Sequence, residues 1–259
     1  MAEVGRVVLV GAGPGDPELL TLKALKALAR ADVVVYDRLV SDEVLALAPA
    51  GAARINVGKQ PDNHPVPQTE INSLLVRLAR SGRRVARLKG GDPFIFGRGS
   101  EEADYLTQHG IPVEVVPGIT SAQGCAASAM VPLTHRGLAQ GVRFVTGHCR
   151  ENIDLDLDWQ GLADPETTLV VYMGMANIEQ ISERLQDAGL PGDTPALAVN
   201  NGTTPREKRI LASLATLPAV ARAAGFNGPV LFVIGRVVEM ALPMAGSQEE
   251  DDAIVASNA

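Results

Sequence analysis

Two glycine-rich segments hold the residues best suited to bind a polar ligand. The first, GAGPGDPELLT at residues 11–21, follows an apolar run and leads into a helical stretch. Glycines there let a ligand approach the backbone, and a helix start favours negative charge. The segment departs from the dinucleotide fingerprint G-x-G-x-x-G, because Asp16 stands at the third glycine position and Pro17 follows it. This segment therefore indicates a ligand loop without identifying the ligand.

The second segment, RLKGGDPFIFGRGSEE at residues 87–102, is more specific about the ligand's charge. Gly90 and Gly91 leave backbone groups open to a polar ligand, and Asp92 adds a carboxylate. A cationic ligand such as a sulfonium suits that carboxylate. Glu101 and Glu102 are placed to begin the next helix, where its dipole favours acids. A purely structural strand-to-helix turn with core aromatics is the alternative.

Elements that could position these segments alternate along the chain. Short β-rich apolar runs separated by Ala/Leu-rich stretches predict βα units around a largely parallel sheet. The expected strands are residues 6–10, 32–36, 54–57, 84–89, 112–116, 142–146, 168–172, 194–199 and 229–237. We expect an N-terminal α/β lobe at 1–117, a C-terminal α/β lobe at 118–242 and a disordered acidic tail at 243–259.

Composition narrows the class of protein. The 259 residues are 46% hydrophobic but only 3% aromatic, which suits strands packed under Ala-rich helices. A formal net charge of −7 argues against a nucleic-acid partner. The four histidines and two cysteines lack metal-ligand spacing, so no metal is expected. Neither a signal peptide nor a long apolar run is seen, and we expect a cytoplasmic protein without a membrane partner.

Taken together, the motifs of this chain resemble the tetrapyrrole methylase family. The resemblance covers roughly residues 5–240 and rests on the order and spacing of several segments. These are VGAGPGDPELLT, VVYDRLVS, VGK, HPVPQTEIN, KGGDPFIFGRGSEE, VPGITSA, PLTHRG, TGH, VYMGM and NGTTPR. Within the family, GRGSEE and THRG point to the members that act on uroporphyrinogen III.

The resemblance implies a fold and a reaction. The expected fold is two α/β lobes with S-adenosylmethionine (SAM) held in the cleft between them, in a homodimer. The expected reaction methylates uroporphyrinogen III at C-2 and C-7 to give precorrin-2 by way of precorrin-1. S-adenosylhomocysteine is the second product, and no metal is needed. The precorrin-2 could serve siroheme, cobalamin or haem d1, because all three routes use this reaction.

The resemblance also assigns roles to individual residues. Asp37 is the expected proton acceptor and Lys59 the expected proton donor. Basic residues must surround the carboxylates of the substrate, and Arg98, Arg136 and Lys59 are the candidates, with Glu101 pairing or shaping them and His64 nearby. The expected SAM contacts are Pro14, Gly90, Gly91, Asp92, Ile95, Thr120, Ser121, Met173 and Gly202.

Other interpretations of the same residues stay open at this point. Asp37 could simply cap a turn, and Lys59 could be a solvated loop lysine. A dinucleotide-dependent oxidoreductase, a tetrapyrrole carrier that leaves SAM intact and a methylase with another substrate are the competing functions. Glu207 and Lys208 stand where the family usually has Gln, which puts that loop in doubt. The fused dehydrogenase and ferrochelatase module of some relatives is not found, so we expect other proteins to carry those steps.

Overall fold

The computed structural model describes residues 4–58, 66–148 and 155–241. The chain divides into two compact units. The first consists of Met1–Gly124 with Thr203–Pro205, and the second of Cys125–Gly202 with Arg206–Ala259. The lobe limits expected from the sequence stay a prediction, and the acidic tail predicted at 243–259 lies outside the described residues.

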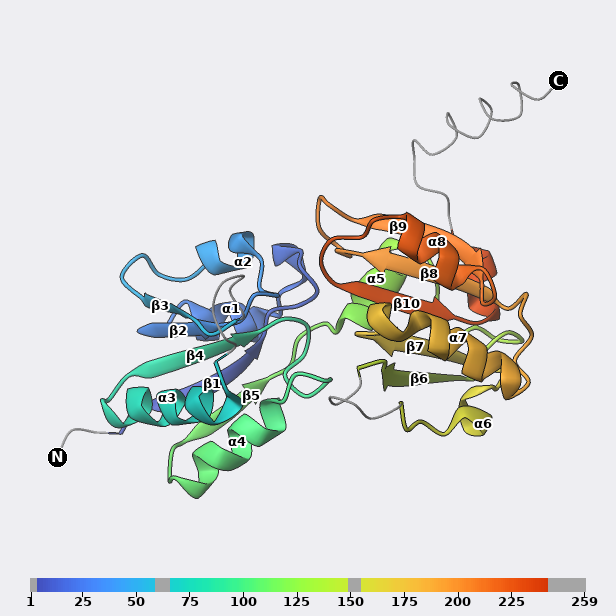
Figure 1. Ribbon diagram of the computed structural model, residues 1–259. Coiled ribbons are helices and arrows are strands. Elements are labelled where there is room, and N and C mark those ends of the chain that lie inside the picture. Colours follow the sequence, from blue (N-terminus) through green and yellow to red (C-terminus); the bar gives the residue numbers. More distant parts are fainter. Residues whose placement is uncertain (1–3, 59–65, 149–154, 242–259) are drawn as a thin grey trace. The chain divides into compact units, whose positions relative to one another are not determined.

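A parallel five-stranded sheet forms the centre of the first unit (Figure 1), with the strand order β3-β2-β4-β1-β5. Its strands are β1 (Arg6–Gly11), β2 (Val33–Tyr36), β3 (Ala53–Asn56), β4 (Arg84–Lys89) and β5 (Val113–Val116). Each lies within a residue or so of the strand expected from the sequence. The prediction of βα units around a parallel sheet is therefore confirmed for this unit.

Helices cover both faces of this sheet because successive side chains of a strand point to opposite faces. Val8 and Val10 pack in one cluster with residues of α1 and α2, while Val7 and Leu9 pack in another with residues of α3 and α4. Figure 1 shows these two pairs on opposite sides of the sheet. The helices are the 3-10 helix η1 (Pro17–Leu19), α1 (Leu22–Leu28), α2 (Asp42–Ala46), α3 (Gln68–Arg80) and α4 (Gly99–Gln108).

Local capping follows the residue types that the sequence placed at helix ends. Asp16 accepts a hydrogen bond from the Glu18 N–H and opens η1, and Thr21 caps α1 in the same way. Gly82 and Gly110 follow helices with φ of +79° and +69°, the left-handed conformation expected of a glycine after a helix.

The second unit is built on another five-stranded sheet, in the order β6-β7-β10-β8-β9. Its strands are β6 (Gly141–Thr146), β7 (Thr167–Tyr172), β8 (Pro195–Asn200), β9 (Lys208–Ser213) and β10 (Val230–Ile234). Only β6 and β7 pair in parallel, and the other neighbouring strands are antiparallel. The expectation of a largely parallel sheet is wrong for this unit.

Two strand assignments also change in the second unit. β9 was not predicted: Lys208 and Arg209 open it, its apolar run is only Ile210 to Ala212, and none of its residues is buried. The strand expected at 229–237 ends earlier, because Gly235 leads into the 3-10 helix η3 (Arg236–Met240).

The apolar core of the second unit lies between its sheet and two helices. Leu169 and Phe232 of the sheet pack with Ile181 of α7 (Ile178–Asp187) and Leu217 of α8 (Leu217–Ala223). The remaining helices are α5 (Ser121–Ser128), which contains the boundary between the units, α6 (Trp159–Leu162) and the 3-10 helix η2 (Met175–Asn177).

In the described part of the chain, every helix is too short or too polar to span a membrane.

Glycines bring the carboxyl ends of three parallel strands together in the first unit. A Cβ on Gly11, at the end of β1, would lie 2.4 Å from the Gly118 backbone nitrogen. A Cβ on Gly118, after β5, would lie 2.3 Å from the carbonyl oxygen of Gly91, after β4. Main chain therefore packs on main chain at this edge, and no side chain fits between the loops.

We expect Gly118→Ala to destabilise the protein by about 1–3 kcal/mol, the usual cost of overpacking. The added methyl group meets backbone, which cannot turn aside as a flexible side chain can. Gly51→Ala is the matched control, because nothing lies within 4 Å of a Cβ built there. Chemical denaturation of both variants measures the difference, and equal stabilities would contradict the packing described.

Candidate functional site

The loops after β1 and β4 lie at the carboxyl ends of the parallel strands, where open parallel sheets bind their ligands. The two strands are neighbours, yet β1 continues towards α1 on one face and β4 towards α4 on the other. Adjacent strands whose connections leave on opposite faces open a crevice at their carboxyl ends, and ligands of open parallel sheets bind there. The two glycine-rich segments of the sequence are these two loops.

Backbone hydrogen bonds join the two loops directly. The Gly13 N–H donates to the Gly91 carbonyl (3.2 Å), and the Gly91 N–H donates to the Gly13 carbonyl (2.7 Å). Gly91 has φ +66°, and a Cβ on it would lie 3.7 Å from both the nitrogen and the hydroxyl oxygen of Ser121, and 3.8 Å from Thr120 Cα. Thr120 and Ser121 therefore stand directly across from the open face of Gly91.

Pro14 belongs to the same group of residues. A Cβ on Gly124, in α5, would lie 2.5 Å from Pro14 Cγ, so the loop after β1 packs against the beginning of that helix. The Ser41 hydroxyl donates to the Gly15 carbonyl (2.8 Å) and ties the loop to α2 as well. The structure thus gathers Pro14, Gly91, Thr120 and Ser121 within the first unit.

Asp92 is bound to its own surroundings more firmly than the sequence indicated. One carboxylate oxygen accepts from the Phe94 N–H (2.8 Å) and the other from the Gly118 N–H (3.0 Å). The Ile95 N–H in turn donates to the Asp92 carbonyl (3.4 Å). Asp92 therefore joins the loop after β4 to the loop after β5, and each of its oxygens keeps a lone pair for a ligand.

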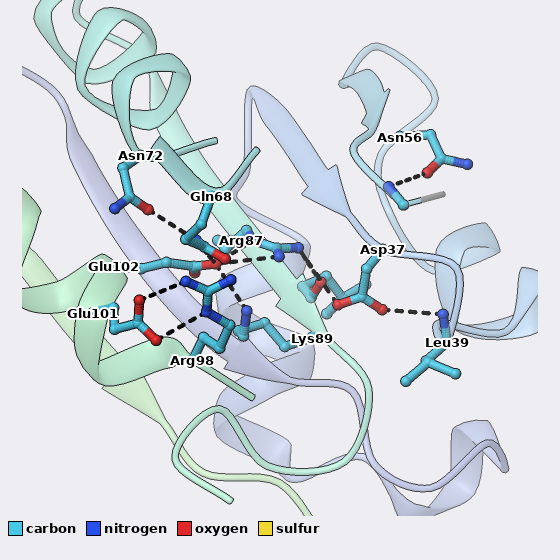
Figure 2. A network of polar contacts seen from close by, with 12 residues as sticks. Asp37, Leu39, Asn56, Gln68, Asn72, Arg87, Lys89, Arg98, Glu101 and Glu102 are labelled. Atoms are coloured by element: carbon cyan, nitrogen blue, oxygen red, sulfur yellow. Dashed lines mark hydrogen bonds and ion pairs between the residues drawn. The ribbon is translucent and has the colours of Figure 1, made fainter. Parts of the chain in front are cut away.

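Asp37, the first residue after β2, has both a structural and an electrostatic partner. Its Oδ1 accepts from the Leu39 N–H (3.0 Å), as in a turn cap, and its Oδ2 lies 3.7 Å from Arg87 Nη1 (Figure 2). The side chain is 26% exposed. The turn-capping role weighed from the sequence is therefore present, and the carboxylate still reaches the surface beside a buried arginine.

Arg98 and Glu101 form an ion pair with each other. Arg98 Nε donates to Glu101 Oε1 (2.9 Å) and Nη2 to Oε2 (2.7 Å), a two-pronged contact that Figure 2 shows at the start of α4. Both side chains are about half exposed, and Arg98 has φ +57°. The bond to Glu101 raises the pKa of Arg98. Glu101 thus holds the guanidinium in one orientation while leaving part of it open to solvent.

Beneath these residues lies a largely buried polar group that the sequence analysis did not identify as a unit. Its members, which we call the Glu102 cluster, are Gln68 of α3, Arg87 and Lys89 of β4, and Glu102 of α4. Glu102 lies in the first turn of α4, as expected from the sequence, and its fully buried side chain also holds two cations. Burial lowers the pKa of Lys89, and the charge of Arg87 adds to that effect.

A signal for the Glu102 cluster was present in the sequence. Arg87 and Lys89 are two residues apart in one strand, so they share a face. In a central strand with helices on both sides, that face is buried, and buried cations need a counter-charge. Glu102 opens the helix that follows the same strand, and it supplies the charge.

Three predicted residues lie in the second unit. Met173 follows β7 with φ +53° and is 50% exposed. Gly202 packs on Cys125, since a Cβ there would lie 2.3 Å from the sulfur atom, so packing alone already requires this glycine. Arg136 is exposed in a turn closed by the His135–Ala139 bridge, and Gly137 beside it has φ +83°.

The loop that departs from the family pattern is well integrated in the second unit. The Ser128 hydroxyl lies 3.1 and 3.0 Å from the two carboxylate oxygens of Glu207, which also pairs with Arg209. Burial raises the pKa of the Cys125 thiol to about 12, and the charge of the Glu207 carboxylate contributes to the same shift. Glu207 therefore has a packing role in this chain.

Lys59 and His64 lie outside the described residues. Gly58, the residue before this gap, packs on the loop of Asp37: a Cβ on it would lie 2.5 Å from the Arg38 nitrogen. The Asn56 side chain accepts from the Gly58 N–H (2.8 Å; Figure 2). In the three described stretches, no group of three or more His, Cys, Asp or Glu side chains could hold a metal ion.

The position of Asp92 leads to a prediction about the loops. Asp92→Ala removes the acceptor of two backbone N–H groups, and a hydrogen bond to a charged group is worth about 1.5–3 kcal/mol. We expect a clear loss of stability and at least about a tenfold loss of affinity for any ligand held at this edge, as 1.4 kcal/mol implies. Denaturation and calorimetry with SAM test this, and Asp104→Ala, at an exposed position of α4 where Asp104 accepts from Gln108, is the control. Wild-type SAM affinity in Asp92→Ala would contradict the placement.

Comparison with known proteins places the chain in a family. The family model for tetrapyrrole (corrin/porphyrin) methylases matches residues 6–218. A uroporphyrinogen-III C-methyltransferase of Paracoccus denitrificans is 58% identical over 96% of this chain and 86% of its own length. A siroheme synthase of Thiobacillus denitrificans is 53% identical over 91% of this chain, which spans about half (49%) of that longer protein.

A solved structure agrees with these sequence matches. The uroporphyrin-III C-methyltransferase of Thermus thermophilus, crystallised with S-adenosylhomocysteine, superposes with a TM-score of 0.77 and 46% identity over 91% of this chain and 99% of that one. The fold of two α/β units and the resemblance noted in the sequence are thereby confirmed. The chain belongs to the tetrapyrrole (corrin/porphyrin) methylases.

Proposed function

We propose that this chain is a SAM-dependent C-methyltransferase that methylates uroporphyrinogen III at C-2 and C-7, giving precorrin-2 by way of precorrin-1. The observation that carries the proposal is the 58% identity to a uroporphyrinogen-III C-methyltransferase across nearly the whole chain. The oxidoreductase suggested by the first glycine loop has no comparable support, because the matching family model is that of the methylases.

The groups at the carboxyl edge of the first sheet fit SAM. That ligand carries a sulfonium cation and an amino-acid group, and the edge offers the Asp92 carboxylate together with the Thr120 and Ser121 hydroxyls. Gly91 keeps the space in front of it open, which a Cβ at φ +66° would fill. Pro14, Gly90 and Ile95 complete the proposed contacts in this unit. Met173 and Gly202 are proposed contacts on the resemblance alone.

Bound SAM supplies an electrophilic methyl group. The residues of this chain have to orient the attacking pyrrole carbon and remove the proton that the methylated substrate loses. Asp37 is the proposed proton acceptor: its carboxylate is partly exposed and its orientation is set by the Leu39 N–H and by Arg87. Lys59 is the proposed proton donor, on the resemblance.

Exposed arginines suit a substrate that carries many carboxylates. Arg136 has its side chain in solvent at the tip of a turn, and a guanidinium can hold a carboxylate with two parallel hydrogen bonds. To bind a substrate carboxylate, the Arg98 guanidinium would have to hold it together with Glu101 or release Glu101. Glu101 therefore sets how readily Arg98 reaches the substrate.

Further parts of the proposal follow from the family. We propose a homodimer in the cytoplasm, whose product feeds siroheme, cobalamin or haem d1 synthesis. The similarity to siroheme synthases supports the first of these routes.

Anaerobic incubation with SAM and uroporphyrinogen III tests the function. We expect mass spectrometry of the tetrapyrrole to show two added methyl groups, with release of S-adenosylhomocysteine. A chain that binds the macrocycle but leaves SAM intact would be a carrier. A chain that methylates only another tetrapyrrole would contradict the proposed substrate but not the family.

Asp37→Asn tests the proton acceptor. The amide oxygen can still accept from the Leu39 N–H, so the turn should survive while the base is lost. We expect turnover to fall by about 10² to 10⁴-fold, the usual contribution of a general base, with little change in either ligand's affinity. Asp42→Asn, an exposed change in the first turn of α2, is the control. A single-turnover rate within about threefold of wild type lies below that range and would leave Asp37 a structural residue.

A further inference from the structure

The three charged side chains of the Glu102 cluster are almost completely buried. The side chains of Arg87, Lys89 and Glu102 are 3%, 5% and 0% exposed. Replacing such a group by apolar residues is often neutral or stabilising in proteins. A buried ion group beside a proposed catalytic carboxylate therefore raises the question of what it does there.

The contacts of Glu102 are one-sided. Its Oε1 accepts from Lys89 Nζ (2.9 Å), from Arg87 Nε and Nη2 (both 3.3 Å) and from Gln68 Nε2 (3.1 Å). Its Oε2 is buried and has no hydrogen-bond partner among the described residues. One carboxylate oxygen thus holds two cations and an amide, and Figure 2 shows these three side chains converging on it.

Arg87 extends this group towards the surface. Nε and Nη2 bind Glu102, and Nη1 donates to the Leu88 carbonyl (3.0 Å) and lies 3.7 Å from Asp37 Oδ2. The guanidinium is planar and rigid, so fixing one edge of it fixes the position of the other. The place of the positive charge beside Asp37 therefore depends on Glu102.

Charge balance leads to the same conclusion. Two cations face the single carboxylate of Glu102, and Asp37 is the next acid that their charge reaches. Gln68 contributes no charge. Its Nε2 donates to Asn72 Oδ1 (2.9 Å) as well as to Glu102, so Gln68 links the Glu102 carboxylate of α4 to α3. Without Glu102, Nε and Nη2 of Arg87 would lose this carboxylate, and the guanidinium would be fixed less firmly beside Asp37.

We propose that Glu102 is a positioning residue for the methyl transfer: it holds the Arg87 guanidinium in a fixed place, and the guanidinium keeps the Asp37 carboxylate aimed at the substrate. This role rests on the proposed function of Asp37 as proton acceptor. Glu102 itself touches neither SAM nor the tetrapyrrole, since its side chain has no exposed surface.

The test uses Glu102→Gln, Asp37→Asn and the two changes together in the full chain. Glu102→Gln should lower kcat by about 10- to 100-fold, part of what a general base contributes, with KM and SAM affinity nearly unchanged. Because Glu102 acts through Asp37, the double variant should be no slower than Asp37→Asn alone, a non-additivity expected of residues in one network. Effects that multiply would overturn the positioning role.

A second pair of variants separates positioning from charge neutralisation. Lys89→Met with Glu102→Gln removes one buried cation and the buried anion together, so it should fold even if Glu102→Gln alone does not. We expect its thermal stability to return towards wild type while kcat stays low. A rate that recovers together with stability would show that Glu102 only neutralises Lys89, and would overturn the proposal.

Asp32→Asn is the matched control. Asp32 pairs with Arg84 at the opposite edge of the sheet (2.6 Å), Arg84 being the first residue of the same strand β4. Its loss should leave kcat unchanged. If the wild-type chain methylates the substrate but the effects of Glu102→Gln and Asp37→Asn multiply in the double variant, only the positioning role is overturned. A wild-type chain without methylation, or an Asp37→Asn variant at full rate, would overturn the proposed function or the proton acceptor, and this role with it.

Discussion

Backbone packing on backbone at the carboxyl edge of the first sheet is the constraint on which the site depends. Gly11, Gly91 and Gly118 end or follow three neighbouring strands, and a Cβ on Gly11 or Gly118 would clash with main-chain atoms. The loops can meet there only because no side chain separates them. Asp92 then ties two of the loops together through backbone N–H groups. A ligand at this edge meets a surface made largely of main chain, whose polar groups are already oriented.

The second constraint is electrostatic and lies one layer deeper. Arg87 and Lys89 are buried between β4 and its helices, and Glu102 supplies the counter-charge that buried cations require. The same pairing brings a fixed positive charge to Asp37 at the end of the neighbouring strand. Packing between glycines thus places the ligand loops, and the Glu102 cluster orients Asp37 beside them.

The second unit follows different rules from the first. Its sheet is mostly antiparallel, so its strands do not all end at one edge, and its proposed site residues come from turns. Gly202 illustrates how packing and function can require the same residue. The sulfur of Cys125 excludes a side chain at this position whether or not a ligand approaches it. Identity among relatives at such a position would not separate the two causes.

Much of the fold and of the candidate site was determined by local sequence. The apolar runs of β1 and β2 predicted strands of the first sheet, since buried parallel strands are nearly continuous apolar segments. The glycines and Asp92 marked the ligand loops because their backbone freedom and charge act locally. What the sequence could not decide depends on contacts between distant segments. β9 carries only a short apolar run behind two basic residues, and it forms by pairing with β8. Glu102 is the helix-start acid that the sequence indicated, but only the packing of α3 and α4 on β4 placed it, fully buried, beside two cations, since burial is a property of the assembled layers and not of the residue.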